Sequence, residues 1–322
     1  MLRGLTQLEG AHLHVSMGFA MAAVASMVIS GLMAAWTCQQ LLVALHRRVH
    51  WPWVVGSLWV SLLGRYIPGK AATVAGAVWL LSRRGVPAGL ATSAILMRTG
   101  TNLVSGLLIA LPLTLWQPVR AKLPGAWLWC VLLAAAGIVL LHPRVFSAAL
   151  SFAFRKLRRP PLPRMPGGRH YLASLASNLL AWLFLGLGCY LGARSVCEVP
   201  IQWVPVFVAA TSLATVLGLL AVFAPGGLGV REGILTVVLA PVLGVGLAGA
   251  VALLLRVLVS ITDILLAAAG ALLLRSRSNS HLEQGQPDDS LPSRDDTSAA
   301  VAGKVIPPAE TGRPNFSNRR GG

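Results

Sequence analysis

Five charged side chains lie within or beside long apolar stretches, where a charge requires a partner or water. They are Arg98, Arg231, Glu232, Arg256 and Asp263. A charged side chain at the centre of a bilayer costs roughly 2.5–3.5 kcal/mol on insertion scales. Such residues belong either to a polar site that binds a substrate or to ion pairs that lock helices together. The sequence leaves both interpretations open.

Arg231 and Glu232 lie near the end of a glycine-rich stretch, residues 225–233, that separates two apolar runs. A helix that begins near Val230 would direct its free N–H groups and the positive end of its dipole at an anion such as a lipid phosphate. Arg231 would add a bidentate contact to that phosphate. Glu232 would be the ion-pair partner of Arg231 or would bind a cationic group. Glycines allow close backbone approach and positive φ angles, and three of them are candidate substrate contacts: Gly226, Gly227 and Gly229.

A second polar stretch, residues 64–70, interrupts the apolar pattern nearer the N-terminus. Its Arg65 and Lys70 would form a matching site from the opposite face of the membrane, or would extend to interfacial phosphates. Arg256 and Asp263 are seven residues apart, so they share one face of a helix at about 10 Å separation along its axis. We therefore expect each of them to face a partner on one of the two interrupted elements.

The histidines and cysteines show no pattern typical of a metal or catalytic site. All seven histidines lie outside the apolar runs, and the four cysteines have neither metal-ligand nor disulfide spacing. Only Cys197 falls outside an apolar run, and we expect it to be exposed. A membrane-embedded transferase would need a positioned base, for which only Glu232 and Asp263 are available. We therefore expect no enzyme activity, no metal and no cofactor.

The composition excludes an ordinary soluble domain. Apolar residues make up 55% of the 322 residues and charged residues 11%, the mean hydropathy is +0.71, and soluble domains carry about 25% charged residues. The sequence predicts an all-α polytopic membrane protein with about 7–9 hydrophobic segments, counted by the usual span length. The apolar segments are 15–45, 51–63, 71–81, 90–116, 126–141, 171–193, 203–223, 234–243 and 247–274.

Basic residues indicate the orientation. They concentrate on alternate loops, at Arg47 and Arg48, at Arg83 and Arg84, and in the loop 142–170, which holds seven bases and no acid. The positive-inside rule places these loops in the cytoplasm, with the N-terminus outside and the C-terminus inside. The basic run within 155–159 is then typical of contact with anionic lipid, and we expect no nucleic-acid partner. Residues 1–275 form the membrane domain, and the polar residues 276–322 are predicted to be a disordered cytoplasmic tail.

In this orientation the two interrupted elements enter from opposite faces. The pair 51–63 and 71–81 enters from the cytoplasm, and the pair 203–223 and 234–243 enters from outside. Such a pair is typical of an inverted repeat with a binding site at the membrane midplane. Ordinary helix hairpins with Gly and Pro kinks are the alternative.

The two polar stretches, Gly64-Arg65-Tyr66-Ile67-Pro68-Gly69-Lys70 and Pro225-Gly226-Gly227-Leu228-Gly229-Val230-Arg231-Glu232-Gly233, resemble the two motifs of a bacterial membrane family. This is the lysylphosphatidylglycerol synthase/flippase transmembrane family, also called flippase-like or UPF0104. The resemblance covers roughly residues 10–275. It implies a polytopic inner-membrane protein that moves a charged or glycosylated lipid between leaflets.

The chain departs from the family in two respects. Bifunctional members carry a soluble aminoacyl-transferase domain after the membrane part, whereas a polar tail follows here, so we expect no lysyl transfer to lipid. Members often have a Glu just before the arginine that matches Arg98 and an acid a few residues later. Met97 and Asn102 stand at those places here, which argues against a cationic headgroup.

Two functional hypotheses follow. The first is a transporter, or flippase, for an anionic lipid or a lipid-linked sugar. The alternative is a non-transporting membrane partner of an envelope glycosyltransferase or lipid-modifying enzyme, and a homo-oligomer is compatible with both. The candidate substrate-binding residues are Arg65, Lys70, Arg98, Gly226, Gly227, Gly229, Arg231, Glu232, Arg256 and Asp263.

Overall fold

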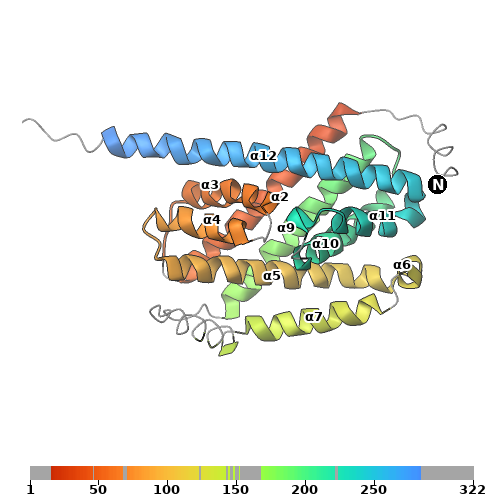
Figure 1. Cartoon of the computed structure of the whole chain (residues 1–322), viewed down its shortest axis with the longest axis horizontal. Helices are drawn as coiled ribbons and strands as arrows, with labels where there is room; N and C mark the ends of the chain where they lie inside the picture. Colours follow the sequence, from red (N-terminus) through yellow and green to blue (C-terminus); the bar gives the residue numbers. More distant parts are fainter. Residues whose placement is uncertain are drawn as a thin grey trace, which may run out of the picture. The chain divides into compact units, whose positions relative to one another are not determined.

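The computed structural model is all-helical over the residues that it describes, and the predicted all-α membrane fold is confirmed (Figure 1). It describes residues 16–283 apart from 46, 68–70, 123–124, 143, 146–147, 149–151, 153–167 and 222–223. The elements are α2 (Met17–Ala44), α3 (Trp51–Ser61), η1 (Leu62–Tyr66), α4 (Ala71–Ser82), α5 (Ala88–Leu115), α6 (Gln117–Lys122), α7 (Ala126–Leu141), α9 (Gly168–Arg194), η2 (Ile201–Trp203), α10 (Val204–Leu220), η3 (Pro225–Gly227), α11 (Val230–Leu243) and α12 (Val245–Glu283).

Five stretches of helix are long and apolar enough to cross a membrane among the described residues: Met17–Ala44, Ala88–Leu115, Gly168–Arg194, Ile201–Leu220 and Val245–Arg275. The chain is therefore a multi-pass membrane protein. Helices α3 and α4 have 11 and 12 residues, or about 17 Å each at 1.5 Å per residue. That length is about half of a bilayer core of about 30 Å, so neither helix alone is long enough to cross it.

The order of elements repeats. Helices α2, α3–α4 and α5 form one long helix, a broken hairpin and a second long helix, and α9, α10–α11 and α12 follow the same order. The contacts between the halves match as well, because the last helix of each half packs on the hairpin of the other. Helix α5 packs on α10. Helix α12 packs on α3, where a Cβ on Gly56 would lie 3.0 Å from the carbonyl oxygen of Gly270. The first helices, α2 and α9, pack along each other. This arrangement is that of an inverted repeat.

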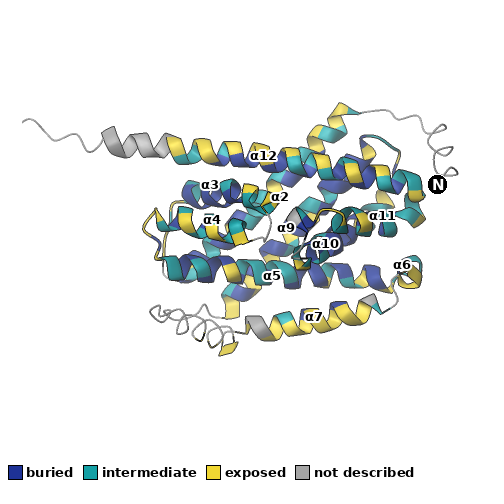
Figure 2. Ribbon diagram, viewed as in Figure 1, coloured by how far each residue is buried: buried dark blue, intermediate teal, exposed yellow. Residues whose placement is uncertain are grey.

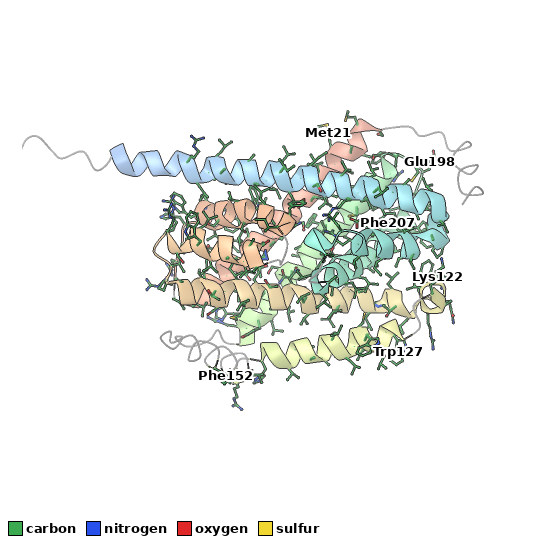
Figure 3. The ribbon with its side chains drawn as sticks, viewed as in Figure 1. Met21, Lys122, Trp127, Phe152, Glu198 and Phe207 are labelled. Carbon is green, nitrogen blue, oxygen red and sulfur yellow. The ribbon has the colours of Figure 1, made fainter. Side chains whose placement is uncertain are left out.

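The two hairpins enter from opposite ends of the membrane domain and meet inside it. In Figure 1, α3 and α4 lie toward one end and α10 and α11 toward the other. Figure 3 places Met21, Lys122 and Glu198 at the end from which α10 and α11 enter. The tips touch, because η1 contacts η3 and a Cβ on Gly226 would lie 3.5 Å from the carbonyl oxygen of Arg65. The charged stretches that are far apart in sequence therefore meet at one junction.

Apolar side chains divide between an interior and a lipid-facing surface. Phe207 is fully buried in the core around α10 and Leu41 in the core around α2, whereas α7 and the outer face of α12 are largely exposed (Figure 2). Figure 3 shows Phe207 directed inward and Trp127 outward. Large exposed apolar residues such as Trp129 and Ile264 are what a bilayer would cover.

The predicted boundary of the tail differs from the observed end of α12. The helix continues to Glu283, past the predicted start of the disordered tail at residue 276. The contacts divide the chain into a unit 1–277 and a unit 278–322. Residues 284–322 lie outside the described residues, so the remainder of the predicted tail stays a prediction.

The close packing of α9 on α10 predicts that Gly186 in α9 tolerates no larger residue. A Cβ at Gly186 would collide with the Cα of Val208 in α10, which is the close backbone approach that small residues allow between membrane helices. We expect Gly186→Ala to cost about 1–3 kcal/mol, as overpacking does, and to lower the melting temperature of the protein in detergent. Gly18→Ala is the matched control, because nothing lies within 4 Å of its added Cβ. Equal melting temperatures for the two variants would contradict the packing of α9 on α10.

Candidate substrate site at the junction of the two hairpins

The last helix of the second half, α12, contacts both hairpin tips through two charged residues, Arg256 and Asp263. Asp263 accepts from the Arg65 guanidinium at 2.8 Å between Nη1 and Oδ2 and from the Tyr66 hydroxyl at 3.0 Å. Arg256 donates to the carbonyl oxygen of Gly226 at 3.1 Å and faces Glu232 at 3.6 Å between Nε and Oε1. The prediction that Arg256 and Asp263 each face a partner on one of the broken elements is confirmed.

The tip of the second hairpin folds as its glycines predict. Gly226, Gly227 and Gly229 all have positive φ angles, of 59°, 72° and 80°, and α11 begins at Val230 as expected. The bend brings the Gly226 carbonyl oxygen to the Arg256 guanidinium. Side chains are strained in this backbone region, which is why glycine occupies it.

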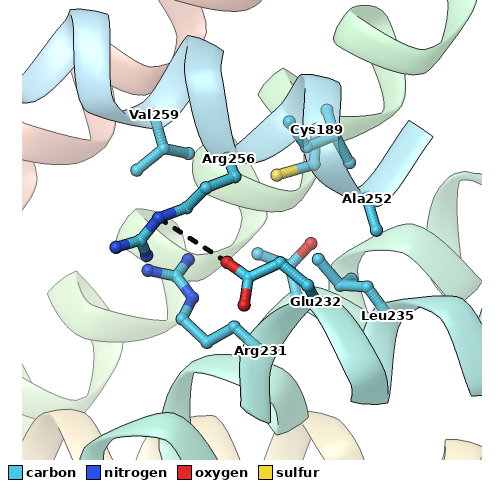
Figure 4. A pocket seen from close by; sticks show the side chains of 9 residues that line it. Cys189, Arg231, Glu232, Leu235, Ala252, Arg256 and Val259 are labelled. Atoms are coloured by element: carbon cyan, nitrogen blue, oxygen red, sulfur yellow. Dashed lines mark ion pairs between the residues drawn. The ribbon is translucent and has the colours of Figure 1, made fainter. Parts of the chain in front are cut away.

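Of the two expectations for Glu232, the ion pair with Arg231 is wrong, because Glu232 pairs with Arg256. Consecutive residues of a helix do not face each other, and Glu232 points to Arg256 while Arg231 lies beside it (Figure 4). The second carboxylate oxygen of Glu232 accepts from the Gly229 N–H at 2.7 Å. One of the free N–H groups expected to bind a phosphate at the start of α11 therefore already has a carboxylate from the chain itself.

Two guanidinium groups of the site have no carboxylate within ion-pair distance among the described residues: those of Arg98 and Arg231. Arg98 in α5 has a buried Nε without a hydrogen-bond partner and is close enough to Arg65 for the two charges to repel. The stem of Arg231 fills the space beside Gly218, where a Cβ would lie 2.6 Å from its Cγ. Its guanidinium is directed to the same side as that of Arg256 (Figure 4).

The described residues of the junction therefore carry an excess of positive charge. Two carboxylates stand against four guanidinium groups, which leaves two positive charges without a counterion from the described part of the chain. Lys70, the other predicted cation of the first tip, lies outside the described residues. Uncompensated charge in a low-dielectric interior is costly, so the junction favours an anion.

A small cavity opens between α9, α10, α11 and α12. Its volume is about 10 Å³, which is about the space of one water molecule. The residues that line it are Cys189, Thr211, Arg231, Glu232, Leu235, Ala252, Leu255, Arg256 and Val259 (Figure 4). The Thr211 hydroxyl and one oxygen of Glu232 have no hydrogen-bond partner there, although most of the cavity lining is apolar.

Two residues of this region differ from the sequence expectation. Tyr66 was not a candidate, because a tyrosine in an interfacial stretch is ordinary and only the fold brings its hydroxyl to Asp263. Cys197, expected to be exposed, is half-buried, and its thiol donates to the Ala193 carbonyl oxygen at 3.3 Å. Burial raises the pKa of the Cys197 thiol, so it is a poor nucleophile at neutral pH.

No group of three or more metal-binding side chains occurs in the described part of the chain.

The charge excess makes a prediction about the Arg65–Asp263 pair. Asp263→Asn would raise the excess at the junction to three positive charges, whereas Arg65→Gln would lower it to one. We expect Asp263→Asn to cost about 3 kcal/mol, near the low end for a broken buried pair, because the Arg65 side chain is 32% exposed. Arg65→Gln should cost clearly less, and the double variant should recover part of the loss. Melting temperatures in detergent measure this order, and a larger loss for Arg65→Gln than for Asp263→Asn would contradict it.

Comparison with known proteins supports the same family as the two motifs. The family model described as lysylphosphatidylglycerol synthase TM region matches residues 3–268. No curated protein matches the chain at a significant level. The match includes both hairpins and all described charged residues of the junction. The chain therefore belongs to the lysylphosphatidylglycerol synthase TM region family, whose members are membrane proteins of lipid metabolism or transport.

Proposed function

We propose that this protein is a lipid transporter that moves a lipid with an anionic headgroup between the leaflets of the bacterial inner membrane. An anionic phospholipid or a lipid-linked sugar phosphate would suit the site. The observation that carries the proposal is the pair of guanidinium groups, Arg98 and Arg231, that have no carboxylate partner among the described residues at the hairpin junction. A phosphate is the natural ligand of such groups, because arginine binds it with two parallel hydrogen bonds.

The arrangement of the hairpins suggests the route. A cavity of about 10 Å³ is too small for a lipid headgroup, so entry requires a tip to move away from α12. Each tip is held to α12 by one ion pair, Arg65–Asp263 for the first and Glu232–Arg256 for the second. Release of one pair at a time would open the site to one leaflet and then to the other, which is alternating access around a fixed site.

The alternative, a non-transporting partner of an envelope enzyme, fits the charges less well. Charges that only lock helices together are expected to be paired with one another. Arg65, Asp263, Glu232 and Arg256 meet that expectation, but Arg98 does not. The transporter therefore ranks first.

The orientation belongs to the same proposal. The basic residues Arg47, Arg48, Arg83 and Arg84 are exposed and lie on the connections at the end opposite to Glu198. With these loops in the cytoplasm, the N-terminus is outside, the C-terminus is inside, and the α3–α4 hairpin enters from the cytoplasm.

Neutralising Arg231 tests transport. In proteoliposomes, wild-type protein should move a fluorescent anionic lipid faster than a zwitterionic lipid of the same chain length. Arg231→Gln should slow the anionic lipid by about tenfold or more, because a hydrogen bond to a charged group contributes about 1.5–3 kcal/mol. Arg120→Gln is the matched control, because Arg120 is exposed at the end of a short helix. Equal rates for wild type and Arg231→Gln would remove Arg231 from the site, and no movement of any lipid by folded protein would reject the transporter.

Cysteine labelling tests the orientation. In a background in which Cys197 is replaced by Ser, Glu198→Cys should react with a membrane-impermeant maleimide in intact cells. Arg83→Cys should react only after the membrane is made permeable. Both positions are exposed, so each gives a signal when the reagent reaches its side. The reverse pattern would invert the proposed orientation.

A further inference from the structure

The charges at the junction do more than favour an anion, because their number indicates how much negative charge the headgroup carries. Four guanidinium groups face two carboxylates among the described residues of the site. A monoanionic phosphodiester, the headgroup linkage of common phospholipids, would leave one positive charge uncompensated. A headgroup with two negative charges would leave no uncompensated charge among these described residues.

We propose that the transported lipid carries a dianionic headgroup, a phosphate monoester or a diphosphate, in preference to a phosphodiester. This inference rests on the proposed function and narrows its substrate class. The free energy of a bound headgroup in the low-dielectric interior is lowest when the charges of the headgroup and of the site cancel. A phosphate monoester is dianionic above its second pKa of about 6.

Arg98 is the residue that distinguishes the two headgroup classes. It lies in α5 at a place that corresponds to Arg256 in α12, since the two helices are the third elements of their halves and both arginines lie at similar distances from the starts of their helices. Arg256 has Glu232 as a partner, whereas Arg98 has a buried Nε with no partner. One half of the repeat therefore supplies its own counterion and the other half does not.

The position of Asn102 provides a way to supply that counterion. Asn102 follows Arg98 by four residues on α5, and side chains at this spacing are neighbours on a helix surface. Its backbone carbonyl oxygen accepts from the Trp182 indole at 3.1 Å and from the Ser105 hydroxyl at 3.0 Å, and both bonds can persist when the side chain is changed. Asn102→Asp therefore adds one carboxylate beside Arg98 with almost no change of shape, and it lowers the positive excess of the site from two to one.

The experiment uses full-length protein in proteoliposomes and three fluorescent probes with matched alkyl chains: a phosphate monoester, a phosphodiester and a phosphocholine. At pH 7.5 the wild type should move the monoester about tenfold faster than the diester, the equivalent of one charge-assisted hydrogen bond. At pH 5, where the monoester has bound one proton and carries a single negative charge, its rate should fall to that of the diester. The diester rate at the two pH values corrects for any titration of the protein itself.

Asn102→Asp should abolish the preference for the monoester while keeping movement of the diester. Asn102→Ser is the matched control, because it changes the side chain without adding charge and should keep the preference. In detergent without lipid, Asn102→Asp should also melt at a higher temperature than Asn102→Ser, because it gives Arg98 a partner. A lower melting temperature for Asn102→Asp would contradict an uncompensated charge at Arg98.

The outcomes separate the two proposals. Equal rates for monoester and diester at pH 7.5, or a preference that persists in Asn102→Asp, would overturn the dianionic headgroup and leave the transporter in place. No movement of any probe by folded wild-type protein would overturn the transporter, and the headgroup inference with it. A monoester preference that depends on pH and is lost in Asn102→Asp would support both.

Discussion

The structure depends on one physical constraint, the cost of a charge that has been removed from water without a counterion. Six charged side chains meet at the junction of two hairpins, and four of them form two ion pairs that attach the tips to α12. The Arg65–Asp263 pair joins segments far apart in sequence, and the Glu232–Arg256 pair joins the consecutive helices α11 and α12. The two guanidinium groups that remain, at Arg98 and Arg231, are the basis of the proposed binding site, because a phosphate can compensate them as well as a carboxylate can.

The arrangement of the helices as an inverted repeat fits the proposed alternating access. Each half presents its hairpin tip from one end of the membrane domain, and the two tips meet at one junction, as in transporters that bind their substrate between such repeats. The halves are similar in the order and packing of their helices but different in their charges. The second half contains both carboxylates, Glu232 and Asp263, and the first half contains none at the junction among the described residues. This asymmetry is the reason why we propose an anion as the ligand and single out Arg98.

Much of the fold was predictable because each element has a local cause. Apolar runs of different lengths separate spanning helices from half-length ones, and the positive φ angles and the start of α11 follow from Gly226, Gly227 and Gly229. The seven-residue spacing of Arg256 and Asp263 predicted that each would face a partner on a broken element, and the structure places those partners on different tips. The choice of partners was harder, because Glu232 has two arginines within reach and only the helix geometry selects Arg256. The role of Tyr66 depends on a contact with Asp263 nearly two hundred residues away, which no local pattern encodes.

The central claim is that an anionic lipid compensates Arg98 and Arg231. The most direct measurement is native mass spectrometry of the protein released from its own membrane in a mild detergent. The account predicts a retained lipid whose mass is that of a phosphate-bearing molecule, present on wild type and on the Arg120→Gln control. Retention should be lost when Arg98 and Arg231 are both replaced by Gln. Retention of the same lipid by the double variant, or retention of only uncharged and zwitterionic lipids by the wild type, would contradict the account.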